Sequence, residues 1–156
     1  MLFRSYQGGK VAYILHPNDP GYIEGETHGL IAAPSDQSTG IKWYNGSYIT
    51  TTAYGNEIGT GNANTIAIVN AQGAGSYAAR LCYDLDLGGY NNWYLPSDEE
   101  LSKILSNKAA IGGFVDDYYW SSTENSDTNA WASDSENSGW AAGKEETLRV
   151  RAVHSF

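Results

Sequence analysis

Segments typical of β-strands stand near both ends of the chain, and the helical signals lie between them. Residues 11–15 form a β-branched and aromatic run that ends at a turn rich in Pro and Gly, and residues 148–154 form a second strand-like run. This order favours the α+β class, in which helices are segregated from strands. With 156 residues the chain has the length of one domain. We therefore expect a single α+β domain in which residues 11–15 pair with residues 148–154.

Two to three helices are expected in the middle of the chain, joined by long ordered loops. The clearest begins at Ser97, which has capping-box spacing to Glu100. The buried stripe of this helix is expected to comprise Leu101, Ile104 and Leu105. A second helix is predicted over residues 77–85, and a third over residues 64–69 with Asn62 as its N-cap.

Charge and composition exclude several classes of partner and site. The chain carries 9 Lys and Arg against 18 Asp and Glu, a net charge of −9. Such a surface repels phosphate backbones and anionic lipid, so we expect no nucleic-acid partner. No apolar run approaches the ~20 residues that span a bilayer, so we expect no membrane insertion. The single cysteine excludes an intramolecular disulfide framework and a multi-cysteine zinc site.

The first five residues are too short to be a secretory signal. They match the translation of a string that ends like a common sequencing adaptor. We therefore expect the authentic domain to span residues 6–156, with residues 1–5 as a non-native leader and an upstream signal lost. The alternative is an ordinary cytosolic start.

Five short segments, taken in order, carry a resemblance to a known family. They are residues 28–33, 59–65, 88–101, 119–124 and 150–156. Together they resemble the Lcl C-terminal-like domain of bacterial collagen-like surface adhesins, over most of residues 6–156. The resemblance implies a C-type-lectin-like fold, with paired terminal strands and a long loop region that presents a binding face. It also implies an extracellular or cell-surface location and no common enzymatic activity.

The polar stretch between Ser122 and Lys144 is the expected binding face. Short amides, carboxylates and aromatic rings in such a loop offer hydrogen bonds and a stacking surface to a sugar or a protein. The candidate ligand-binding residues are Asn129, Trp131, Asp134 and Asn137. The alternative is that Trp131 and the nearby Trp140 are core aromatics beneath a solvated loop.

Calcium is the one ion that the same stretch suggests, because calcium takes about 6–8 oxygen ligands. The candidate ligands are Glu124, Asp127, Asp134 and Glu136. The Glu-Pro-Asn and Trp-Asn-Asp motifs of sugar-binding calcium lectins are absent, and so is EF-hand spacing. A plain solvated acidic loop is therefore favoured, and no cofactor is expected.

No group of residues predicts catalysis. The three histidines are far apart in the sequence, and Cys82 falls on the apolar face of a predicted helix. Asn45 begins the one N-glycosylation pattern, but Asn45-Gly46 is also a hairpin turn signal, which we favour. We therefore expect that the protein is not an enzyme.

Three functions remain open at this point. The first is an adhesion module whose loops bind a glycan or a protein. The second is a structural subunit whose copies contact one another head to tail in an extracellular filament. The third is a ligand-binding protein diversified by a retroelement, which would show clone-to-clone differences confined to residues 118–145.

Overall fold

The computed structural model describes residues 5–156, which form nine strands and four helices. The strands are β1 (Ser5–Tyr6), β2 (Gly9–Ile14), β3 (Gly29–Ala32), β4 (Ser38–Ile41), β5 (Tyr119–Glu124), β6 (Asn129–Ser133), β7 (Gly139–Gly143), β8 (Leu148–Val150) and β9 (Val153–Ser155). The helices are α1 (Gly61–Gln72), α2 (Ala78–Tyr83), α3 (Asp98–Ser106) and α4 (Lys108–Ile111). All four helices lie between β4 and β5 in the chain, so the expected α+β class is confirmed. Of the expected leader, only Ser5 lies within the described residues.

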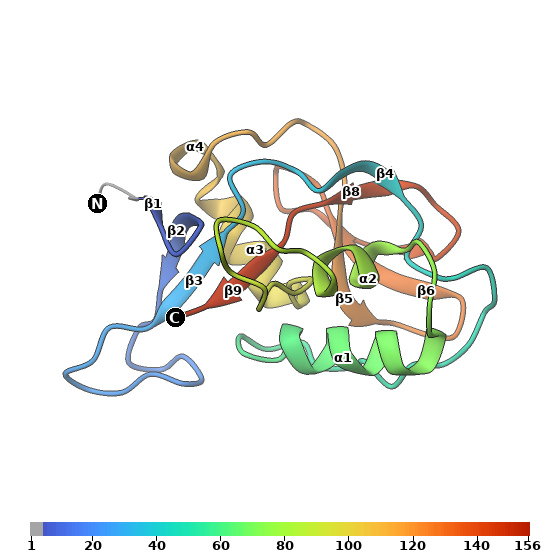
Figure 1. Ribbon diagram of the computed structural model, residues 1–156, viewed down its shortest axis with the longest axis horizontal. Helices are drawn as coiled ribbons and strands as arrows, with labels where there is room; N and C mark the ends of the chain where they lie inside the picture. The colour runs from blue at the N-terminus through green and yellow to red at the C-terminus, as the bar shows by residue number, and fades with distance from the viewer. Residues whose placement is uncertain (1–4) are drawn as a thin grey trace.

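The strands near the two ends of the chain share a sheet but do not pair with each other. The order of this sheet is β1-β2-β3-β9, antiparallel throughout (Figure 1). The expected pairing of residues 11–15 with residues 148–154 is therefore wrong, because β3 separates the two. All four residues of β3 are buried, so both faces of this strand are covered.

The second sheet has the order β4-β8-β5-β6-β7, in which β5 and β8 run parallel. The strand expected over residues 148–154 is divided between the two sheets, since β8 lies in this one and β9 in the other. Arg151 lies at the division and is fully buried. Its guanidinium donates to the carbonyl oxygens of Ala33 (3.0 Å) and Gly112 (3.1 Å) and pairs with Asp36 (Nη2–Oδ1 2.8 Å). These contacts fix the point where the chain crosses from one sheet to the other.

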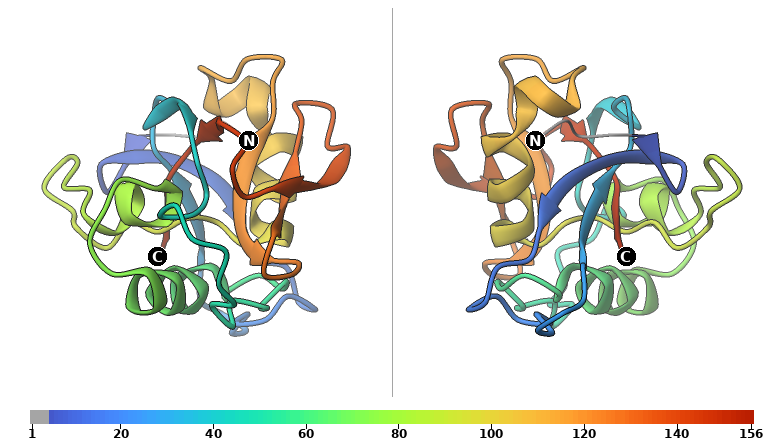
Figure 2. Two further views of the ribbon diagram at one scale, coloured as in Figure 1. Left: turned by 90° about the vertical axis from the view of Figure 1, so that its right-hand side faces the viewer. Right: turned by 90° about the vertical axis from the view of Figure 1, so that its left-hand side faces the viewer.

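Alternate side chains of β5 face two separate hydrophobic clusters. Trp120 packs in the larger cluster, together with residues of α1 and α2, whereas Tyr119 packs in the smaller cluster with the apolar side of α3. α1 and α3 therefore lie on opposite faces of β5, as the two side views show (Figure 2). This arrangement buries both faces of the strand.

α3 begins as the sequence predicts, and α1 does not. The Ser97 side chain accepts from the Glu100 backbone N–H, Glu100 completes the capping box, and the expected apolar stripe is buried. The N-cap of α1 is Thr60, so the prediction of Asn62 as the cap is wrong. A Cβ on Gly61 would clash with the Glu100 carboxylate, so the close packing against α3 requires glycine there and places the helix start before Asn62. None of the helices within residues 5–156 is long and apolar enough to cross a membrane.

Candidate functional site

The predicted binding face lies on the hairpin of β6 and β7. Asn129 and Trp131 belong to β6, and Asp134 and Asn137 lie in the turn that leads to β7. β6 is fixed between β5 and β7 by antiparallel pairing on both edges. The structure therefore brings the four predicted ligand-binding residues onto one hairpin.

Most polar groups of this hairpin are already engaged within the protein. Asn129 donates through Nδ2 to the carbonyl oxygen of Ala141 (3.0 Å) and accepts at Oδ1 from the Thr128 hydroxyl (2.7 Å). The Oδ1 atom of Asp134 accepts backbone N–H groups two and four residues further on, at 3.0 and 2.8 Å. Asn137 donates to a serine hydroxyl on α3 (2.7 Å). These short side chains shape the hairpin and its turn. Within residues 5–156, only Oδ2 of Asp134 and Oδ1 of Asn137 are without a hydrogen-bond partner among the amide and carboxylate atoms of these three residues.

The two hairpin tryptophans point to opposite faces of the sheet. Trp131 is paired across the strands with Ala141, and Trp140 with Ala132, so the two rings alternate in direction. Trp131 is half-buried, and Trp140 is 42% exposed with its ring edge against Tyr118 (centroids 5.4 Å apart). Neither ring is enclosed as a core aromatic would be, and the two rings do not form one stacking surface.

The four candidate calcium ligands lie at opposite ends of β6. Glu124 and Asp127 are near the connection from β5, whereas Asp134 and Glu136 are in the turn to β7. Glu136 also pairs with Lys108 (Nζ–Oε1 2.8 Å). Within residues 5–156, no three His, Cys, Asp or Glu side chains gather in a way that could hold a metal ion.

Glu124 belongs to a buried ion pair that supports the hairpin. Its Oε1 atom lies 3.2 Å from Nζ of Lys144, and both side chains are almost fully buried. Lys144 also donates to the Ile49 carbonyl oxygen (3.0 Å), and Glu124 accepts the Thr51 backbone N–H (2.7 Å). The Lys144 ammonium lies 4.7 Å from the ring centroid of Trp43, and burial lowers its pKa. This pair ties the end of β5 and the residue after β7 to the loop before α1.

The residues that could support catalysis are dispersed. His16 stacks on a neighbouring tyrosine, His28 pairs with Glu26 (Nε2–Oε2 2.7 Å), and His154 is buried beside aromatic rings. Hydrogen bonding to Glu26 raises the pKa of His28. Cys82 is buried on the apolar face of α2, where burial raises the pKa of its thiol and keeps it protonated. Among the described residues these groups do not form a nucleophile and base pair.

Asn45 forms a turn but not a hairpin. Gly46 has φ +93°, which suits a turn, but β4 pairs with β8, and the next element along the chain is α1. Nδ2 of Asn45 donates to the carbonyl oxygens of Ala74 (2.7 Å) and Gln72 (3.2 Å). The nitrogen that would carry a glycan therefore anchors this turn to the end of α1.

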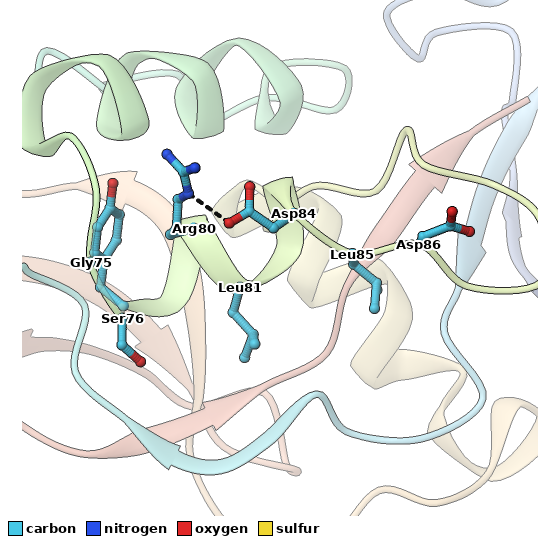
Figure 3. Close-up of a pocket in the computed structure, with 8 residues that line it drawn as sticks. Gly75, Ser76, Arg80, Leu81, Asp84, Leu85 and Asp86 are labelled. Carbon is cyan, nitrogen blue, oxygen red and sulfur yellow. Dashed lines mark hydrogen bonds and ion pairs between the residues drawn. The ribbon is translucent and has the colours of Figure 1, made fainter.

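Two clefts that the sequence analysis did not foresee lie on either side of the segment after α2. The first, which we call the arginine cleft, has a volume of about 300 Å³ and is shown in Figure 3. It is lined by Gly75, Ser76, Tyr77, Arg80, Leu81, Asp84, Leu85 and Asp86. The second, which we call the asparagine cleft, has a volume of about 480 Å³. It is lined by Asn62, Ile66, Tyr83, Asp84, Leu85, Asp86, Asn91, Asn92 and Trp93.

The asparagine cleft gathers side-chain amides beside an exposed aromatic ring. Asn62 and Asn91 are exposed, and neither side-chain amide is hydrogen-bonded to another residue of the described chain. Tyr83 stands beside them with 47% of its surface exposed. Three separate stretches of the sequence supply these walls, so no single motif reveals the cleft. Asn62 and Asn91 belong to two of the segments that carry the family resemblance. Membership of these segments is the feature of the sequence that could have indicated the two residues.

Comparison with known proteins supports the resemblance. The family model of the Lcl C-terminal domain matches residues 33–154. Among solved structures, the chain is similar to a fimbrial protein from Bacteroides ovatus ATCC 8483, with a TM-score of 0.55 and 16% sequence identity. The similarity covers 93% of this chain and 43% of that one, so at this identity it shows a shared fold over part of a longer protein. No curated protein matches the sequence significantly.

Proposed function

We propose that this chain, which belongs to the Lcl C-terminal domain family, is a non-enzymatic binding module displayed outside the cell or on its surface. The fold shared with a fimbrial protein supports a surface role. The net charge of −9 favours neutral or basic partners over nucleic acid. The expected partner is a glycan or a protein.

The observation that carries this proposal is the gathering of unpaired amides beside an exposed aromatic ring in the asparagine cleft. Amides of Asn62 and Asn91 offer both donors and acceptors, and the Tyr83 ring offers a flat apolar surface. A concave surface of this size with few, convergent polar groups is typical of small-ligand sites. The hairpin of β6 and β7 is the second candidate face, with Trp131 as its principal contact.

A screen of the purified domain on a glycan array, with and without a chelator, tests the function. Two variants then locate the face: Tyr83→Ala with Asn91→Ala for the cleft, and Trp131→Ala with Asp134→Ala for the hairpin. We expect the cleft variant to bind about tenfold more weakly and the hairpin variant to bind like the parent. Circular dichroism verifies that both variants fold.

If the hairpin variant bound more weakly than the cleft variant, the binding face would lie on the hairpin. Equal binding by the parent and both variants would contradict both faces. The exposed Tyr54→Ala change provides a matched control, because Tyr54 is 54% exposed and lies outside the cleft.

A second candidate function is a structural subunit of an extracellular filament. The likeness to a fimbrial protein favours it, although the present chain spans only 43% of that chain. Electron microscopy of the purified domain separates the two candidates. Regular filaments would support the structural role, and a monodisperse preparation over a wide concentration range would argue against it.

A further inference from the structure

The asparagine cleft contains one negative charge without a partner. Asp84 is paired with Arg80 on the preceding turn of the chain (Nε–Oδ2 2.7 Å). Asp86 also lines the cleft, and within residues 5–156 it has no ion-pair partner. Within residues 5–156, no Lys, Arg or His lines this cleft. The local charge therefore favours a cationic group over an anionic one.

Tyr83 lines the cleft with about half of its surface exposed. The Arg80 guanidinium lies over the ring, 5.7 Å from its centroid. Because Arg80 is also paired with Asp84, the three side chains support one another. An exposed aromatic ring beside polar groups is suited to the C–H face of a sugar ring.

The amides complete a site for hydroxyl groups. Asn62 projects from the first turn of α1, and Asn91 and Asn92 project from the loop before Trp93. Asn92 is partly engaged, since its Nδ2 atom lies 3.5 Å from Nδ1 of His154. The amides of Asn62 and Asn91 are left to pair with a ligand that has both donors and acceptors.

We infer that the asparagine cleft binds an amine-bearing sugar, with Tyr83 as the stacking surface and Asp86 as the carboxylate that selects the positive charge. This inference rests on the proposed binding function and adds the ligand class. A neutral sugar of the same shape makes the same stacking and amide contacts without the ion pair. An acidic sugar is repelled by Asp86 and by the overall charge of −9.

Three related probes test the inference. Glucosamine, glucose and glucuronic acid share a pyranose ring and are cationic, neutral and anionic in mildly acidic buffer. Titration is followed by the NMR signals of the asparagine side-chain amides. We expect affinity to fall in that order, by up to about fivefold per step, which is the range of an exposed ion pair. High salt should reduce the differences, because it screens exposed charges.

The Asp86→Asn variant should retain binding but bind the cationic and neutral probes equally. Glu146→Gln removes an exposed carboxylate outside the cleft and should leave the order unchanged. Equal affinity for all three probes in the parent protein would overturn the inference while leaving the binding function intact. Binding to other glycans or proteins, but to none of these probes, would also overturn the inference and leave the binding function intact. If the protein bound no glycan and no protein, both the proposed binding function and this inference would be contradicted.

Discussion

Glu100 is a buried carboxylate near the start of α3. It lies where α3 meets the turn before α1 and Tyr94, which is bridged to Val153 of β9. Its oxygens accept the backbone N–H groups of Ser97 (2.9 Å) and Gly59 (2.7 Å), and the Tyr94 hydroxyl lies 3.5 Å away. Despite these donors, burial raises the pKa of Glu100 above its ordinary value. The ionised form is thus less favourable in the folded protein than in the unfolded chain.

This shift predicts a pH-dependent contribution to stability. Because the folded pKa is the higher one, the Glu100 contribution is greatest below its unfolded pKa and falls as the pH rises through the folded pKa. Glu100→Gln should cost about 1–3 kcal/mol, since an amide leaves some of the buried donors unpaired. The difference in unfolding free energy between parent and variant should narrow as the pH rises from acid to neutral.

Urea denaturation of both proteins at several pH values measures this difference. The contributions of the other carboxylates to the pH dependence cancel, because both proteins contain them. A difference that widens with rising pH would mean that the backbone donors outweigh the burial of Glu100 and that its folded pKa is lowered.

The pair of Lys144 and Glu124 predicts a second large effect of a single residue. Lys144→Met leaves the Glu124 carboxylate buried without a counter-charge, so we expect a loss of about 3–5 kcal/mol. Adding Glu124→Gln to this variant should restore part of the loss. Lys42→Met, at an exposed lysine that also lies near a tyrosine ring, should change stability by less than about 0.5 kcal/mol. A double variant no more stable than Lys144→Met would contradict the ion-pair account.

At the residue scale, composition indicates which groups can bind a ligand but not which of them are free. Asn129 and Asn62 are the same residue type, and both occur in polar stretches. The amide of Asn129 donates a hydrogen bond to the carbonyl oxygen of Ala141, which lies 12 residues away across the hairpin. The Asn62 amide stays free because α1 begins before it and leaves it on an exposed turn. Both outcomes depend on how the strands and helices pack, which the local sequence does not encode.

At the element scale, the N-cap of α3 is the prediction that can be tested most directly. Ser97 is buried, accepts the Glu100 N–H and donates to the Glu57 carbonyl oxygen (2.9 Å). Ser97→Ala should therefore lower the unfolding free energy by about 1–2 kcal/mol, at the upper part of the range for a lost N-cap. Ser106→Ala, at the exposed end of the same helix, provides the control and should be nearly neutral. An unchanged thermal midpoint for Ser97→Ala would contradict the role of this cap.

The elements differ in how far their neighbours in the sequence determine them. The capping box and apolar stripe of α3 lie within nine residues, so the helix was predictable from its own sequence. The order of the first sheet depends on β3, which meets β9 more than a hundred residues later. The run over residues 148–154 reads as one strand because only the distant partners of Arg151 reveal the break.

For the whole molecule, the C-terminal strand is an internal part of the fold. β9 pairs with β3 along one edge, and Val153 exchanges two backbone hydrogen bonds with Tyr94 on the other (2.8 and 3.0 Å). β1, by contrast, is a two-residue strand at the edge of the same sheet. A filament built from this domain would therefore have to use surfaces that are already formed, because withdrawing β9 would open the sheet.

Truncation tests this placement. Removing residues 153–156 deletes β9, leaves buried backbone groups of β3 without partners, and removes the fully buried Val153 and His154. We expect this truncated protein to lose its cooperative thermal transition and its dispersed NMR spectrum. Removing Phe156 alone deletes the two hydrogen bonds to Gly29 (3.1 Å each) and should lower the thermal midpoint without unfolding the protein. A cooperative transition in the protein that ends at Ala152 would mean that the sheet closes without β9, and the C-terminal strand would then be available for exchange between copies.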